Sequence, residues 1–116
     1  MTWLERPPDL RVAFISGPYS ARTIFGRLLN IYRAGKVAVK YWELGYSVVC
    51  APMNSALMGE LWFHSDKCNY EMFMQGYLTM LRRCDTIVMM RGWQRSPGAC
   101  REWELAKRLG KVILYE

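Results

Sequence analysis

Four short apolar runs alternate with segments of helical periodicity along the chain, and this alternation limits the possible folds more than any other feature. The apolar runs span residues 10–16, 46–51, 85–90 and 111–115. Between them, apolar residues recur every three or four positions, which predicts helices over about 22–44, 65–83 and 98–109. Strands that alternate with such helices pair in parallel through right-handed crossovers. We therefore predict an α/β fold: a small parallel sheet of four to five strands with helices on both faces, flavodoxin- or Rossmann-like.

The chain has the length of one domain. It contains 116 residues, of which 52% are hydrophobic, and this is enough to bury a core of the usual single-domain size. We predict one domain over residues 1–116, in which residues 1–9 are a lead-in broken by Pro7 and Pro8. The sequence has neither a signal-peptide-like apolar run nor a segment of about 18 apolar residues. We therefore expect a cytoplasmic protein that has no membrane partner.

The net charge of +6 is spread over scattered lysine and arginine residues. No block of five or more like charges occurs, and several basic residues recur at the spacing of a solvated helix face. This pattern disfavours polymeric nucleic acid as the partner. The same charge suits a site for a small anionic molecule.

The cysteines and the histidine do not form a metal-binding pattern. Cys50, Cys68, Cys84 and Cys100 lie 16 to 18 residues apart, whereas zinc sites need clustered ligands. We expect free thiols, no metal and no other cofactor. His64 could be a lid residue that contacts substrate, but it lies in an aromatic segment, and packing is the interpretation that we favour.

Ligands of open parallel sheets bind at the carboxyl ends of the strands. This rule selects the loops over residues 16–20, 52–54 and 91–98. Asp85 begins its strand, so it belongs at the opposite edge, where we expect a structural role. In the first loop Gly17 would let a ligand approach the backbone, although an ordinary turn explains the glycine too. This loop matches neither the dinucleotide-binding pattern nor the P-loop.

The loop over 91–98 leads into the helix that carries Glu102. Ser96 is predicted to cap this helix, with Pro97 at the first helical position. In one interpretation Glu102 is a first-turn acid favoured by the helix dipole. In the other, amides near Ser96 and Gly98 hold a phosphate, and the dipole keeps Glu102 ionised, as a nucleophile requires. Position alone favours the first interpretation.

Several short segments from residue 11 onward together form a family pattern. They are Val12–Tyr19, Asn30 with Ala34, Ala51–Asn54, Cys84 with Asp85, and the run from Gly92 to Lys111. This pattern resembles the nucleoside 2-deoxyribosyltransferase-like superfamily, and within it the small phage and bacterial proteins. Its most specific part is Ser96-x-Gly98-x-x-x-Glu102. This part is also similar to the nucleophile segment of the deoxynucleoside 5′-monophosphate N-glycosidases.

The resemblance implies a reaction at Glu102. Its carboxylate would attack the anomeric carbon of a nucleoside or nucleotide, and water or a second base would resolve the covalent glycosyl-enzyme, as in retaining glycosidases. Tyr19 would orient Glu102 or the sugar. The implied substrate contacts are Ser16 and Gly17 at the base, Ser96 and Gly98 at the 5′-phosphate or 5′-hydroxyl, and Asn54 at the base or sugar. Trp93 could stack on a base or cover the end of the sheet.

One position departs from the family pattern. Family enzymes commonly carry an aspartate eight residues before the Cys-Asp pair that opens a strand, and this chain has Tyr77 there; Asp66 or Glu71 could replace it as the acid. Two further hypotheses stay open: a non-catalytic nucleotide-binding or nucleotide-sensing module, and a phage accessory protein that binds a host partner. We prefer hydrolysis of a nucleoside 5′-monophosphate because of Ser96, Gly98 and the positive charge.

The predicted helix over 65–83 is apolar on more than one face between residues 70 and 81. A single helix on a small sheet cannot bury all of these side chains. We therefore expect a two-fold homodimer that uses this surface.

Overall fold

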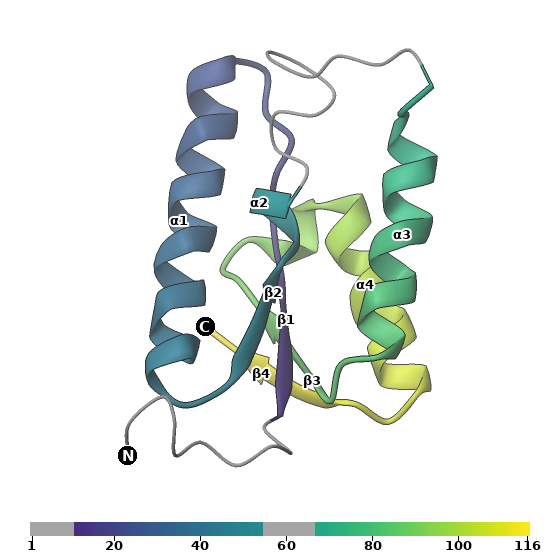
Figure 1. The fold of residues 1–116 in the computed structure, drawn as a ribbon. Helices are drawn as coiled ribbons and strands as arrows, with labels where there is room; N and C mark the ends of the chain where they lie inside the picture. The colour runs from purple at the N-terminus through teal and green to yellow at the C-terminus, as the bar shows by residue number, and fades with distance from the viewer. Residues whose placement is uncertain (1–10, 55–66) are drawn as a thin grey trace.

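Figure 1 shows an open parallel sheet that has helices on both faces. The computed structural model describes residues 11–54 and 67–116. The strands are β1 (Val12–Ser16), β2 (Ser47–Cys50), β3 (Thr86–Met89) and β4 (Val112–Tyr115), in the order β2-β1-β3-β4. The helices are α1 (Ile24–Glu43), α2 (Ala51–Asn54), α3 (Tyr70–Arg82), α4 (Pro97–Arg108) and the short 3-10 turn η2 (Trp93–Arg95). Because α1 covers one face and α3 and α4 the other, the predicted α/β fold is confirmed.

Alternating side chains of β1 divide the core into two layers. Ala13 and Ile15 pack in the layer next to α1. Phe14 packs on the opposite face, in the layer that holds Ala106 of α4. Because successive side chains of a strand point to opposite faces, Ser16 lies on the same side as Phe14. The last residue of this central strand therefore faces α4.

The strand order creates a switch point beside β1. The chain passes from β1 to β2 on one side and later returns to β3 on the other side of β1. Ser16 is the register partner of Met89, so β1 and β3 end at the same level. The connections after these two strands lead in opposite directions, and ligands of open α/β sheets bind at such a point. The loops after β1 and β3 therefore meet at one edge of the sheet, as the sequence predicts.

Two side chains fix the starts of α1 and α3. Thr23 accepts a hydrogen bond from the backbone N–H of Gly26 at 3.0 Å, and Asn69 accepts one from that of Met72 at 2.9 Å. Because a side chain of this kind satisfies an otherwise unpaired first-turn amide, α3 begins at Tyr70. The start predicted from periodicity was several residues too early.

The second strand ends earlier than its apolar run predicts. β2 stops at Cys50, and Ala51–Asn54 form the short helix α2. Pro52 fits the first turn of a helix, because the N–H that it lacks has no intrahelical acceptor there. The prediction that the strand continues to Ala51 and ends at Pro52 was wrong.

Asp85 lies at the edge of the sheet away from the switch-point loops. Its carboxylate accepts a hydrogen bond from the N–H of Val12 at 2.9 Å, and its own N–H donates to the carbonyl of Val12 at 3.0 Å. Both bonds tie the start of β3 to the start of β1, so the predicted structural role is confirmed.

The longest helix of the described residues is α1, with 20 residues. Neither this helix nor any other in residues 11–54 and 67–116 is long and apolar enough to cross a membrane.

Candidate active site

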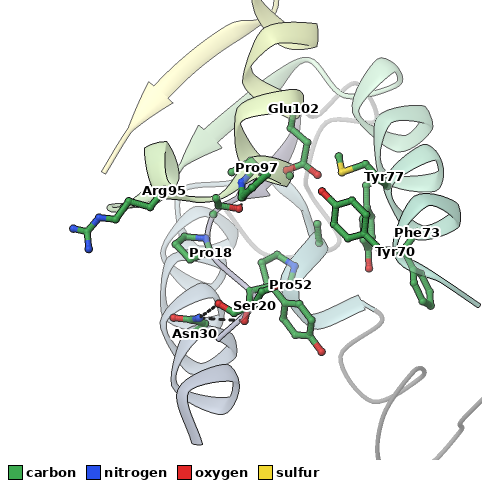
Figure 2. Close-up of a pocket in the computed structure, with 18 of the residues that line it drawn as sticks. Pro18, Ser20, Asn30, Pro52, Tyr70, Phe73, Tyr77, Arg95, Pro97 and Glu102 are labelled. Atoms are coloured by element: carbon green, nitrogen blue, oxygen red, sulfur yellow. Dashed lines mark hydrogen bonds between the residues drawn. The ribbon is translucent and has the colours of Figure 1, made fainter. Parts of the chain in front are cut away.

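A cavity of about 1050 Å³ opens at the carboxyl edge of the sheet. Four groups of residues line it: the loop after β1 with Asn30 and Arg33 of α1, Ala51 and Pro52 of α2, the first turns of α3 with the residues just before it, and the segment after β3 that leads into α4. Figure 2 shows Glu102 reaching into this space from α4, with Tyr70 and Tyr77 of α3 across from it. In a βαβ unit each helix starts at the carboxyl edge, which is why the first turns of the helices form the walls.

Helical spacing turns Glu102 inward. Ala99, Glu102 and Ala106 lie three and four residues apart and form the buried stripe of α4. Glu102 is only 5% exposed, and one of its carboxylate oxygens accepts a hydrogen bond from the hydroxyl of Ser16 at 2.6 Å. The pleat of β1 and the inner face of α4 thus bring together two of the predicted site residues.

Burial raises the pKa of Glu102 from 4.5 to about 7, although the Ser16 hydroxyl acts in the opposite direction. A carboxylate removed from water loses hydration, so its neutral form is favoured. Glu102 is the sixth residue of α4, and the dipole of a helix acts mainly within its first turn. The expectations that Glu102 is a first-turn acid and that the dipole keeps it ionised were therefore wrong; burial instead favours its protonated form.

The start of α4 supplies hydrogen-bond donors to the cavity. Ser96 caps the helix, since its side-chain oxygen accepts from the N–H of Ala99 at 3.2 Å, and Pro97 is the first helical residue, as predicted. Gly98 lines the cavity, and its amide is one of the first-turn groups that have no acceptor within the helix. The hydroxyl proton of Ser96 and the amide of Gly98 can therefore both bind an anion.

Arginine side chains differ in what they offer the cavity. Arg33, Arg91 and Arg95 belong to its lining, but Figure 2 shows the Arg95 side chain extending away from Glu102. Arg101 is not part of the lining, because Glu71 holds its guanidinium by two bonds of 3.0 and 3.1 Å. Positive charge thus reaches the cavity from Arg33 and Arg91.

Aromatic side chains cover the α3 side of the cavity. Tyr70, Phe73 and Tyr77 all line it, and the rings of Phe73 and Tyr77 stack with centroids 6.5 Å apart. Tyr77, which stands where the family resemblance leads one to expect an aspartate, therefore contributes a phenol to the wall. Of the two substitute acids, Glu71 is bound to Arg101 instead, and Asp66 lies outside the described residues.

The loop after β1 forms the opposite wall. Gly17 and Tyr19 line the cavity, as predicted. The side-chain amide of Asn30 donates to the backbone carbonyls of Tyr19 and Ser20 at 3.1 and 3.5 Å (Figure 2). A side chain of α1 therefore holds this loop in place. Gly17 also leaves no room for a larger residue, because a Cβ there would lie 2.6 Å from Cβ of Met90.

Three of the predicted substrate contacts do not line the cavity. Ser16 is fully buried and is not among the lining residues. Asn54 ends α2 in an exposed position and is not among the residues that line the cavity, since the helical turn directs it elsewhere. Trp93 does not line the cavity either. Its ring packs on Trp103 at 5.2 Å and on Tyr115 at 6.3 Å, so it covers the end of the sheet.

Sequence reasoning missed Arg33, Tyr70 and Phe73 as cavity residues. The apolar spacing of α3 indicated core and subunit contacts and gave no reason to assign a ligand to Tyr70 or Phe73. Tyr70 and Phe73 lie in the first turn of a crossover helix. Because such turns lie at the carboxyl edge of the sheet, this position could have indicated that the two side chains line the cavity.

Metal ligation finds no support in the described ranges, which contain no group of three or more histidine, cysteine, aspartate or glutamate side chains placed to hold an ion. His64 lies outside those ranges.

The fold and the cavity define a class: a small open parallel α/β protein with a buried carboxyl group in a ligand-sized cavity at its switch point. Residues 29–115 match the family described as a domain of unknown function, DUF4406. Because the match covers most of the chain, the protein belongs to this family. A comparison with curated proteins gives no match.

Proposed function

We propose that the protein cleaves the N-glycosidic bond of a nucleoside 5′-monophosphate or nucleoside through a covalent glycosyl-Glu102 intermediate. One observation carries the proposal: Glu102 is the one carboxyl group among the described residues that line the cavity, and it lies beside the anion-binding start of α4. A carboxylate can stabilise an oxocarbenium-like transition state and form a reversible ester with the sugar.

The first step would join a Glu102 oxygen to C1′ as the bond from C1′ to the base nitrogen breaks. The electron pair of that bond leaves with the base, and the base nitrogen takes a proton from water. Ser16 holds one carboxylate oxygen of Glu102, so the other oxygen can attack. In the second step water, or a second base, attacks C1′ and releases the carboxylate; with water, a proton is lost and the sugar leaves as the free hemiacetal.

The other groups of the cavity fit the parts of such a substrate. The Ser96 hydroxyl and the Gly98 amide would bind the 5′-phosphate, with Arg91 adding positive charge. The tyrosine and phenylalanine side chains of α3 offer flat surfaces on which a base can stack. A free nucleotide of this kind would be met in the cytoplasm, which stays our prediction for the location.

A second candidate is a nucleotide-binding module that performs no reaction. Tyr77 favours it, because a phenol in the cavity wall replaces the carboxylic acid that would protonate the leaving base. The raised pKa of Glu102 also lowers the fraction of nucleophilic carboxylate at neutral pH. In this case the same cavity binds the same ligand without turnover.

An assay of base release separates the two candidates. Wild-type protein, Glu102→Gln and the control Glu104→Gln are incubated with a panel of ribonucleotides and deoxyribonucleotides, and the free base is measured. Glu104 is exposed on the same helix, so its variant carries the same change in charge outside the cavity. Base release by the wild type and Glu104→Gln, but not by Glu102→Gln, supports the enzyme. Equal release by all three proteins excludes Glu102 as the nucleophile, and a rise in Tm with a nucleotide but no base release supports the binding module.

A further inference from the structure

The hydroxyl of Tyr70 crosses the gap between α3 and the start of α4. Tyr70 is the first residue of α3, and Gly98 is the second residue of α4. A Cβ on Gly98 would lie 3.4 Å from the Tyr70 hydroxyl, so this oxygen lies beside the backbone of Gly98. Figure 2 shows Tyr70 across the cavity from Pro97 and Glu102. A side chain of α3 therefore reaches the turn of α4 whose amides have no acceptor within the helix.

The arrangement of the two helices assigns this hydroxyl to one end of the cavity. α3 and α4 lie on the same face of the sheet, and each begins at its carboxyl edge (Figure 1). Helical side chains lean toward the N-terminus of their helix, and Met74 accordingly reaches the same place, with Sδ 3.5 Å from the Cβ position of Gly98. Glu102 lies one helical turn further along α4. The Tyr70 hydroxyl therefore lies at the phosphate end of the cavity, one turn from the proposed nucleophile.

The proton of the Tyr70 hydroxyl is available to a ligand. Arg101 donates a hydrogen bond to the oxygen of Tyr70, and this bond occupies a lone pair and not the proton. Within residues 11–54 and 67–116, no group accepts a hydrogen bond from this hydroxyl. Tyr70 lines the cavity, so a ligand oxygen can accept the proton there.

Together with the start of α4, Tyr70 offers donors on two sides of one place. The hydroxyl proton of Ser96 and the amide of Gly98 approach it from α4, and Tyr70 approaches it from α3. A phosphate group has several oxygens that can accept these bonds at the same time. Hydrogen bonds to such an anion are roughly twice as strong as those between neutral groups. The three donors therefore suit a phosphate better than a single neutral hydroxyl.

We propose that the Tyr70 hydroxyl binds the 5′-phosphate of the ligand together with Ser96 and Gly98, and that this bond makes the protein prefer a nucleoside 5′-monophosphate to the nucleoside. The ligand class rests on the proposed function, but the preference concerns binding and holds for the enzyme and for the binding module alike. A nucleoside has one neutral 5′-oxygen with two lone pairs, which cannot serve three donors at once. Tyr70 is 56% exposed, so its hydroxyl binds water when no phosphate is present.

The test compares the affinity for nucleotides with that for nucleosides. Calorimetric titrations use the four deoxynucleoside 5′-monophosphates and the four matching nucleosides, in the Glu102→Gln protein, where the proposed reaction cannot consume the ligand. Adding Tyr70→Phe, which keeps the ring, is expected to weaken nucleotide binding about tenfold, the effect of one hydrogen bond to a charged group. The affinity for nucleosides is expected to stay nearly the same.

Tyr32→Phe in the same Glu102→Gln protein is the matched control. Tyr32 is an exposed tyrosine on α1 and is not among the residues that line the cavity, so its variant loses a hydroxyl elsewhere and should keep the preference for nucleotides. Equal nucleotide affinity with and without the Tyr70 hydroxyl overturns the proposal. An equal loss for nucleotides and nucleosides in Tyr70→Phe also overturns it, because that result indicates a structural role.

Inorganic phosphate separates a failure of this proposal from a failure of the proposed function. Phosphate is expected to raise the Tm of the wild type and of Tyr32→Phe more than that of Tyr70→Phe. If phosphate acts through Tyr70 but no nucleotide binds, the proposed function fails and the phosphate contact stands. If nucleotides bind and Tyr70→Phe changes neither measurement, only the role of Tyr70 is overturned. If neither phosphate nor any nucleotide binds, both are overturned.

Discussion

The hydroxyl of Ser16 donates a hydrogen bond of 2.6 Å to the carboxylate of Glu102, and it joins the end of the central strand to the second turn of α4. Ser16 is fully buried and Glu102 nearly so. A hydrogen bond to a carboxylate in such surroundings favours its charged form. The hydrogen bond from Ser16 therefore opposes the effect of burial on the pKa of Glu102.

Replacement of Ser16 by alanine is expected to raise the pKa of Glu102 further above about 7, because burial then acts without the opposing hydroxyl. Base release at neutral pH should fall several-fold, and the acid limb of the profile of kcat/KM against pH should move to higher pH. Ser47→Ala, at the start of β2, serves as the control. An unchanged acid limb in Ser16→Ala would show that Glu102 does not control the reaction.

The stability of the protein should also depend on Glu102. Its pKa is about 7 in the folded protein and 4.5 as the ordinary value, so the folded state binds more protons between these pH values. The free energy of unfolding therefore falls as pH rises from about 4.5 to about 7, by at most about 3 kcal/mol at about 1.4 kcal/mol per pKa unit.

The variant Glu102→Gln lacks this titration. Urea denaturation is expected to show it more stable than the wild type at pH 8, with a smaller difference or none at pH 4. A Glu102→Gln protein that is less stable than the wild type at pH 8 would contradict the raised pKa.

Gly98 offers a test of the anion site that does not depend on Glu102. A Cβ at this position would lie 3.4 Å from the hydroxyl of Tyr70 and 3.5 Å from Sδ of Met74, which are ordinary contact distances. Gly98→Ala should therefore fold normally, since alanine is favoured over glycine in helices.

The same Cβ would enter the cavity where the phosphate is proposed to bind, so Gly98→Ala should weaken nucleotide binding at least tenfold in calorimetry. Gly76→Ala on α3 is the control, because a Cβ there meets nothing within 4 Å. Equal affinity in both variants would place the phosphate elsewhere.

Two arginines should respond differently to the same substitution. Arg91 lines the cavity, whereas Arg101 is held by Glu71 outside it. Arg91→Gln is expected to reduce nucleotide affinity and to flatten its dependence on salt, because one charge on the phosphate is lost. Arg101→Gln breaks an exposed ion pair and should change neither affinity nor Tm appreciably. The reverse order of effects would argue against the cavity as the binding site.

The sequence predicts those features that depend on local spacing. Ser96 and Pro97 fix where α4 begins, and the position of Glu102 on its inner stripe follows from helical periodicity. The end of β1 is equally local, because an apolar run stops at Gly17. The fold and the pairing of the two switch-point loops therefore follow from patterns within a few residues.

The parts that the sequence does not predict depend on contacts between distant segments. Trp93 is a residue type that often stacks on ligands, but its ring packs against the rings of Trp103 and Tyr115 instead. Asn54 is turned outward by a helical turn that its apolar neighbours do not indicate. The pKa of Glu102 depends on how deeply the assembled sheet and helices bury it, which no local pattern expresses.

The measurement that tests the central claim most directly is the mass of the protein quenched in acid during turnover. A covalent intermediate predicts a species heavier than the protein by one sugar phosphate, or one sugar for a nucleoside, with the added mass on the peptide that contains Glu102. The species should be absent from Glu102→Gln and present in Glu104→Gln. Release of base by the wild type with no such adduct, or with the adduct on another residue, would contradict a glycosyl-Glu102 intermediate.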